Sequence, residues 1–121
     1  MARASKDLLF FLKNSGDIER VKKAGCRFQT SLFNLVSCRS EKPYARVGVI
    51  VGKRLGGAVI RNRAKRIFRE LARQSRSQLV PGRDMLVFPK HSVLATAHRV
   101  LRDMWLTALR QQALIRTGDK P

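Results

Sequence analysis

The stretch from Arg46 to Glu70 reads RVGVIVGKRLGGAVIRNRAKRIFRE, and it contains the change of pattern that decides the fold. Its first part is rich in β-branched residues and predicts a strand over residues 44–51. Gly56 and Gly57 interrupt this pattern, and a helix is predicted over residues 58–76. Apolar residues recur at helical spacing along one side of that helix, at Ile60, Ala64, Ile67, Phe68 and Leu71. The chain therefore passes here from a buried strand to an amphipathic helix.

The opposite side of this helix is cationic. Four basic residues follow one another at steps of four, namely Arg61, Lys65, Arg69 and Arg73, with Asn62 and Arg66 beside them and Arg63 near the boundary. Like charges at this spacing destabilise an isolated helix by a few tenths of a kcal/mol per pair. The whole chain has 26 basic and 8 acidic residues, a formal net charge of +18. We therefore predict a surface that binds a polyanion, and the excess of arginine favours bidentate contacts with phosphate.

Two further elements, and a possible third, are predicted before this stretch. A helix is expected over residues 15–24, with Ser15 as its N-terminal cap and Gly25 ending it in the left-handed conformation. A strand over 32–38 follows, and residues 27–31 either form a short strand or lead into it.

Two elements are predicted after it, a short buried strand over residues 85–88 and a last helix that starts near Ser92. This order is typical of an α+β sandwich with helices packed on a small sheet, and its 121 residues suit one domain, residues 1–121. A right-handed strand–helix–strand crossover is the default, although the order of segments does not determine it. Residues 1–6 and 117–121 are expected to be flexible.

Several classes of function are excluded by the composition. The acids are scattered singly, whereas a two-metal nuclease needs several carboxylates around its ions. His91 and His98 are too far apart to share a metal, and Cys26 and Cys38 are expected to be packing residues rather than a disulfide framework. The longest apolar run, 47–52, is far shorter than the ~20 residues of a spanning helix, so we expect a cytoplasmic protein without a membrane partner.

Aromatic residues are candidate stacking platforms, since a base on an aromatic ring contributes roughly 1–3 kcal/mol in single-stranded nucleic acid. Phe28 lies between Arg27 and Gln29 and is the best candidate, with Tyr44 and the pair Phe10–Phe11 as others. The core is expected to take the remaining large rings, Phe33, Phe68, Phe88 and Trp105.

The run from Arg61 to Arg66, followed by Arg69, resembles the RNR motif of the bacterial ribonuclease P protein component, and it follows the segment Gly-Lys-Arg-x-Gly-Gly as in that family. The resemblance extends from about residue 7 to about residue 115 and includes Asp17–Gly25 and Gly82–Asp84. It implies an α-β-β-β-α-β-α sandwich similar to a ribosomal-protein domain, with a left-handed strand–helix–strand crossover.

The resemblance also implies a function. The chain would join a catalytic RNA, one protein to one RNA, as the accessory subunit of an endoribonuclease that removes the 5′ leader from precursor tRNA. The RNA would supply the active site and hold the Mg²⁺ ions, so neither a catalytic residue nor a metal site made by side chains alone is expected in the protein.

Site residues follow from the same resemblance. The residues expected to face the catalytic RNA are Arg61, Asn62, Arg63, Lys65, Arg66 and Arg69, flanked by Lys53, Arg54 and Arg73. The leader is expected in a cleft between the sheet and the first helix, lined by Ile18, Lys22 and Val36, with Phe28 as the candidate for base stacking.

Two alternatives stay open from the residues alone. One is a ribosomal or RNA-chaperone protein that binds structured RNA without a linked reaction. The other is a DNA-binding architectural protein, which is disfavoured because no helix-turn-helix pattern is present, so no DNA partner is expected.

Overall fold

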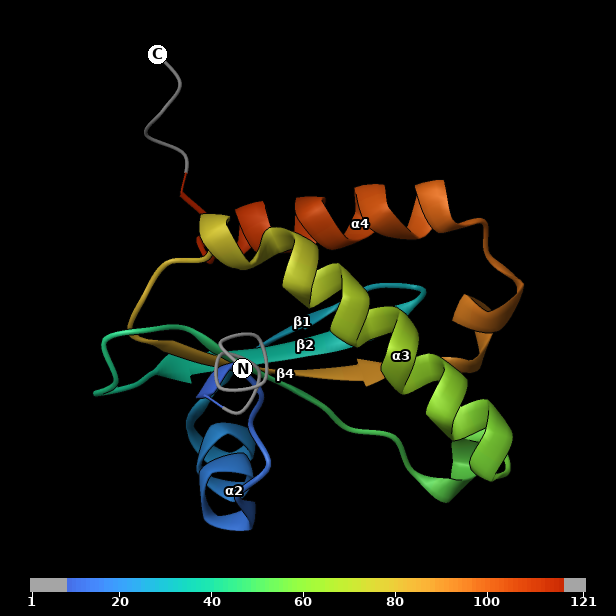
Figure 1. Ribbon diagram of the computed structural model, residues 1–121, viewed down its shortest axis with the longest axis horizontal. Coiled ribbons are helices and arrows are strands. Elements are labelled where there is room, and N and C mark those ends of the chain that lie inside the picture. The colour runs from blue at the N-terminus through green and yellow to red at the C-terminus, as the bar shows by residue number, and fades with distance from the viewer. Residues whose placement is uncertain (1–8, 117–121) are drawn as a thin grey trace, which may run out of the picture.

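The computed structural model describes residues 9–116, so the expected flexibility of residues 1–6 and 117–121 lies outside the described residues. From residue 15 to residue 111 the helices and strands follow one another as α2 (Ser15–Ala24), β1 (Cys26–Gln29), β2 (Phe33–Arg39), β3 (Arg46–Val49), α3 (Ala58–Ser75), β4 (Arg83–Pro89) and α4 (His98–Gln111). This is the predicted α-β-β-β-α-β-α order in a mixed α+β domain, and Figure 1 shows its arrangement.

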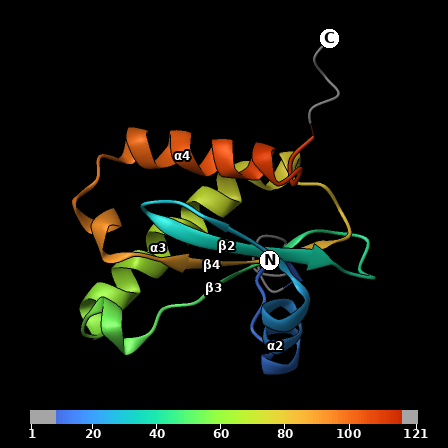
Figure 2. The ribbon, with the colours of Figure 1, turned by 180° about the vertical axis from the view of Figure 1, so that it is seen from behind.

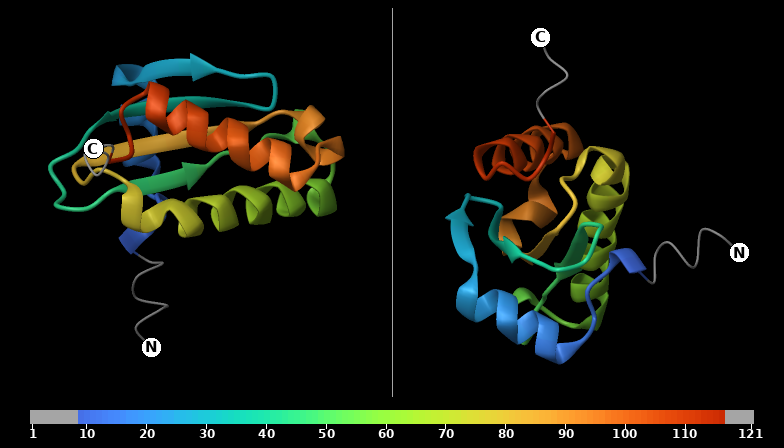
Figure 3. Two further views of the ribbon diagram at one scale, coloured as in Figure 1. Left: turned by 90° about the horizontal axis from the view of Figure 1, so that it is seen from above. Right: turned by 90° about the vertical axis from the view of Figure 1, so that its left-hand side faces the viewer.

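The four strands form one sheet in the order β1-β2-β4-β3. The pairs β1–β2 and β2–β4 are antiparallel, whereas β3 and β4 are parallel and are joined through α3. In the left panel of Figure 3 the face of the sheet that α3 and α4 cover is toward the viewer, β3 and β4 point right, and β4 lies above β3. This arrangement is a left-handed crossover, as the family resemblance implies and against the general default.

Helices cover both faces of the sheet. Figures 1 and 2 show α3 and α4 on one face and α2 alone on the other. The larger core lies under α3 and α4, where the rings of Phe33, Phe68 and Trp105 contact one another at centroid distances of 5.4 to 6.1 Å. The smaller core lies under α2 and consists of Leu12, Val21, Val36 and Leu86. The two faces are thus stabilised by separate sets of contacts.

The ends of α2 differ from the prediction. Asn14, not Ser15, caps the helix, because its side-chain oxygen accepts hydrogen bonds from the backbone N–H groups of Gly16 (2.8 Å) and Asp17 (3.1 Å). Gly25 is extended (φ −80°) rather than left-handed. A glycine is nevertheless required there, since a Cβ atom would lie 2.5 Å from Val36 Cγ1. The close approach of α2 to β2 explains this residue.

The turn before α3 also depends on a glycine. Gly56 has a φ of +148°, which L side chains rarely adopt, and a Cβ there would contact Ile60 at 3.0 Å. The strand predicted over 44–51 is shorter, Arg46–Val49, and Lys53–Leu55 form a 3₁₀ turn instead. The chain thus leaves the sheet early and turns tightly into α3.

Three further expectations are corrected. Residues His91–Ala95 form a 3₁₀ turn, in which the Ser92 hydroxyl donates to the Ser31 carbonyl (2.7 Å), and α4 starts only at His98. Phe88 is half-buried on the α2 side rather than part of the main core, and Cys26 is exposed rather than packed. Within residues 9–116, no helix has the length and apolar character needed to cross a membrane.

Candidate nucleic-acid interface

The first candidate surface is the polar side of α3. Five of its side chains line one shallow depression of about 290 Å³, and we call this set the α3 face: Asn62, Lys65, Arg66, Arg69 and Arg73. The apolar side of the helix is directed at the sheet, where Phe68 and Leu71 are buried. The structure therefore brings together most of the RNR-motif residues that the sequence analysis singled out.

One aromatic ring, that of Phe11, packs against two arginines of the α3 face. The guanidinium carbons of Arg69 and Arg73 lie 5.7 and 5.2 Å from the ring centroid of Phe11. Arg73 also pairs with Glu70, with 3.4 Å between Nη1 and Oε1. Stacked guanidiniums lose less conformational freedom when they bind a phosphate, so these contacts prepare the face for an anion.

The remaining predicted cations lie at its edges. Arg61 is half-buried, and its Nε has no hydrogen-bond partner within residues 9–116. Arg63 is exposed and outside the depression. Lys53 and Arg54 are exposed in the 3₁₀ turn that precedes α3.

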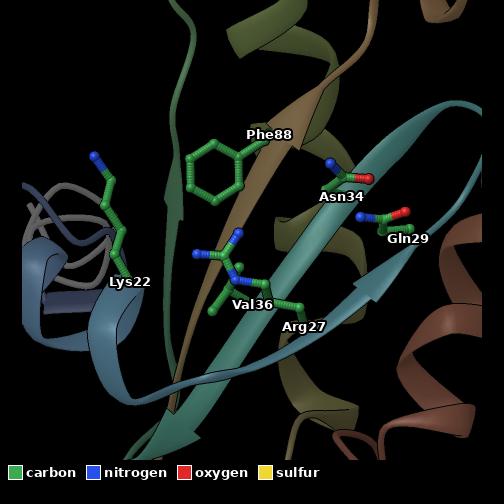
Figure 4. Close-up of a pocket in the computed structure, with 6 residues that line it drawn as sticks. All are labelled: Lys22, Arg27, Gln29, Asn34, Val36 and Phe88. Atoms are coloured by element: carbon green, nitrogen blue, oxygen red, sulfur yellow. The ribbon is translucent and has the colours of Figure 1, made fainter.

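The second candidate surface is a groove of about 250 Å³ on the α2 side of the sheet, shown in Figure 4. We call it the leader groove, and it is lined by Lys22, Arg27, Gln29, Asn34, Val36 and Phe88. Its side chains combine two cations, two amides and two apolar groups. The Oδ1 atom of Asn34 is buried and has no hydrogen-bond partner in the described part of the chain, so its capacity to accept a hydrogen bond is unused in this arrangement.

The strand register explains which residues line the groove. Arg27 pairs with Val36, and Asn34 pairs with both Gln29 and Phe88, so all five side chains lie on the same face of the sheet.

Alternation places Phe28 on the opposite face. Phe28 pairs with Leu35 and packs against the main core, so it is not part of the groove. Ile18 packs in the small core beside Val36 and supports the groove without lining it. Of the predicted cleft residues, Lys22 and Val36 therefore come together there. Four residues of the groove were not predicted as cleft residues, namely Arg27, Gln29, Asn34 and Phe88, although the alternation in 33–36 already separates Asn34 from the buried side.

A cluster of ion pairs, the Asp84 cluster, connects α2 to the sheet. The carboxylate of Asp84 is fully buried and accepts hydrogen bonds from Arg46 of β3 (2.9 Å from Nε, 2.7 Å from Nη2) and from Arg20 of α2. Arg46 also pairs with Asp17 of α2 at 3.3 Å. The hydrogen bonds to Asp84 raise the pKa of both guanidiniums above the ordinary value, against the effect of burial. Both arginines stay charged, and the position of α2 over the sheet is thereby defined.

The side chains that could bind a metal ion are dispersed over residues 9–116. No three His, Cys, Asp or Glu side chains among residues 9–116 are placed to hold an ion. The described residues thus do not fit a magnesium site made by the protein alone.

Comparisons with known proteins agree with this geometry. A family model for ribonuclease P matches residues 10–113. The ribonuclease P protein component of Roseiflexus castenholzii is 35% identical over 107 residues, which cover 88% of this chain and 84% of the relative. That of Geobacillus kaustophilus is 28% identical over 111 residues, which cover 91% and 92%.

Solved structures show the same fold. A mutant ribonuclease P protein of Staphylococcus aureus with defective mRNA degradation activity superposes with a TM-score of 0.85 at 22% identity, covering 93% of this chain and 96% of that one. The ribonuclease P protein of Thermotoga maritima gives a TM-score of 0.75 at 25% identity, covering 83% and 94%. The chain belongs to the family of ribonuclease P protein components, the protein parts of an RNA-associated endoribonuclease of tRNA processing.

Proposed function

We propose that this chain binds the catalytic RNA of ribonuclease P through the α3 face and holds the 5′ leader of precursor tRNA in the leader groove. In this way it assists the hydrolytic removal of the leader, which produces the mature 5′ end of the tRNA. The observation that carries the proposal is the α3 face, a cationic surface on a helix whose opposite side is buried, in a chain of net charge +18.

The α3 face suits the phosphates of a folded RNA. Its arginines offer planar pairs of donors that match phosphate oxygens, and the repulsion within the cationic row falls when phosphates lie against it. We assign these contacts to the five residues of the α3 face, Asn62, Lys65, Arg66, Arg69 and Arg73, with Arg61, Arg63, Lys53 and Arg54 beside it.

The leader groove suits a single strand. Val36 and Phe88 provide an apolar wall for the faces of bases, while Lys22 and Arg27 provide charge for the adjoining phosphates. Asn34 and Gln29 offer amide groups that can hydrogen-bond to base edges. The leader therefore meets apolar, amide and cationic groups at one place.

Catalysis is assigned to the RNA. The Mg²⁺ ions of the reaction would be held by RNA phosphates, since the described side chains do not form a site for them. The part of this chain is to bind and orient the RNA and the leader, one protein to one RNA. We place this work in the cytoplasm, where tRNA is processed.

A cleavage assay tests the proposal. Precursor tRNA is incubated with a bacterial ribonuclease P RNA at low Mg²⁺, with and without the protein. We expect the protein to stimulate cleavage at the mature 5′ end only when the RNA is present. The stimulation should fall when the leader is shortened to one nucleotide.

Two other results would contradict the proposal. Tight RNA binding that is indifferent to the leader, without stimulation, would favour a ribosomal or RNA-chaperone protein. Cleavage by the protein alone would contradict the assignment of catalysis to the RNA.

A further inference from the structure

A third concave surface lies at the C-terminal end of α3, away from the leader groove. It has a volume of about 630 Å³ and is built by chain segments far apart in sequence. We call it the Tyr44 pocket, and its main lining residues are Phe10, Tyr44, Arg73, Arg76, Leu79 and Arg116. In the right panel of Figure 3, the end of α3, the loop before β3 and the chain after α4 all lie on the side facing the viewer.

The walls of the Tyr44 pocket are held in place by main-chain contacts. After α4 the chain runs back along the segment that links α3 to β4, where the N–H of Val80 donates to the Leu114 carbonyl (2.8 Å). The N–H of Arg116 donates to the Gln78 carbonyl, also at 2.8 Å. These bonds hold the backbone of the exposed Arg116 at the rim of the pocket, so the position of its backbone does not depend on side-chain contacts.

The chemistry of the pocket is that of a nucleotide site. Three guanidinium groups line it, and no acidic residue does so in the part of the chain that the structure describes. Arg76 is stacked over the ring of Phe10, with 4.6 Å between the guanidinium carbon and the ring centroid. Tyr44 is half-buried beside them and offers a ring and a hydroxyl group. Guanidiniums bind phosphate through paired donors, and a base can stack on the tyrosine ring.

We propose that the Tyr44 pocket binds a nucleotide of the catalytic RNA, at a place beyond the RNR motif. The proposal rests on the proposed function and extends the RNA interface around the end of α3. Arg73 lines both the Tyr44 pocket and the α3 face, so a bound RNA strand can pass continuously from one to the other. The pocket shares no lining residue with the leader groove, so its occupant is the catalytic RNA and not the leader.

Chemical protection of the tyrosine provides the first test. Tyr44 is the only tyrosine in the chain, so nitration by tetranitromethane, read by mass spectrometry of its peptide, reports on this pocket alone. We expect saturating catalytic RNA to slow the nitration of Tyr44 several-fold. A leader oligonucleotide and inorganic phosphate at matched ionic strength should leave the rate unchanged.

Matched charge removals provide the second test. Arg116→Ala removes one charge from the pocket, and Arg102→Ala removes one from an exposed position on α4. Loss of one phosphate contact reduces the slope of log affinity against log salt by about 0.7 to 0.9, so we expect this reduction for Arg116→Ala and no change for Arg102→Ala. Tyr44→Phe should keep the affinity for the catalytic RNA, because it keeps the ring, and Tyr44→Ala should lower it several-fold.

Failure of this inference is distinguishable from failure of the proposed function. If the complex forms and stimulates cleavage while Tyr44 is nitrated at the free rate, only the Tyr44 pocket is wrongly assigned. Protection by the leader oligonucleotide alone, or equal salt slopes for Arg116→Ala and Arg102→Ala, would also overturn it. If no complex with the catalytic RNA forms at all, the proposed function itself fails.

Discussion

The α3 face and the leader groove use polar side chains in different ways. Four of the five residues of the α3 face are cations, whereas the groove sets two cations beside two amides and two apolar side chains. Phosphates are the same along any RNA, but bases differ in their edges. The first surface therefore suits binding that is indifferent to sequence, and the second suits a strand whose bases are in contact with the protein.

The two surfaces also differ in the contacts that hold their secondary-structure elements in place. The α3 face rests on the large core through Phe68 and Leu71, while the groove exists only because α2 is held over the sheet by a small core and the Asp84 cluster. Substitutions should therefore affect the two surfaces separately.

The largest effect is expected for Asp84→Ala. It leaves Arg46, whose side chain is 12% exposed, without its buried partner, and removing one member of a buried ion pair costs about 3–5 kcal/mol. Urea denaturation should show this loss, while Asp103→Ala, at an exposed position on α4, should change stability little. A loss below about 1 kcal/mol would mean that α2 is held mainly by its apolar contacts.

Leu71→Ala tests the support of the α3 face. Leu71 is 1% exposed, and truncating a buried leucine destabilises a protein by about 2–5 kcal/mol. Val59→Ala, on the same helix at 82% exposure, is the control and should have almost no effect. Equal losses in the two variants would show that the buried side of α3 has been assigned incorrectly.

The double variant Arg61→Ala/Arg66→Ala tests the α3 face together with the neighbouring Arg61. We expect weaker binding to the catalytic RNA and a salt slope reduced by about 0.7 to 0.9 for each lost phosphate contact, with the unfolding free energy nearly unchanged. The double variant Arg102→Ala/Arg110→Ala removes the same charge from exposed positions of α4 and should retain the slope. An unchanged slope in the first variant would exclude phosphate contacts at these two residues.

The smallest effect is expected for Asn34→Ala in the leader groove. Its buried Oδ1 has no partner within residues 9–116, so its removal should leave the stability unchanged or slightly higher. If that oxygen accepts a hydrogen bond from a leader base, the affinity for precursor tRNA falls by about 0.5–1.5 kcal/mol, and the affinity for tRNA without a leader does not change. Competition binding with the two tRNAs measures the difference.

Local patterns in the sequence predicted the elements well. The helix over 15–24 has the predicted bounds, and the helix predicted over 58–76 ends one residue earlier, at Ser75. The helix over 58–76 has strong apolar periodicity, whereas the helix over 15–24 has only a thin apolar side and is predicted from its end residues, which are short-range features. The error at Ser15 has the same origin, because two adjacent residues, Asn14 and Ser15, are both good caps and only the geometry decides between them.

Contacts between residues far apart in the sequence could not be predicted from such local patterns. Arg20, Arg46 and Asp84 are separated by 26 and 38 residues, and no periodicity connects them. Phe28 is the predicted stacking residue because it precedes the first clear strand and lies between Arg27 and Gln29. Once β1 is paired with β2, however, alternation places this ring on the opposite face. The candidate RNA-binding helix was therefore predictable from its own sequence, whereas the groove depended on the pairing of strands.

The cationic row on α3 has a consequence for the amount of protein that a cell retains. Glu70 is the only acid on that helix and it pairs with Arg73, so repulsion among the cations of the row is only partly offset in the free chain, and RNA phosphates would reduce it further. A ligand at a hundred times its dissociation constant adds about 2.7 kcal/mol to the stability of its partner. Chains without RNA would then open more often and be degraded faster by proteases than assembled ones. Turnover would in this way match the supply of the protein to that of its RNA.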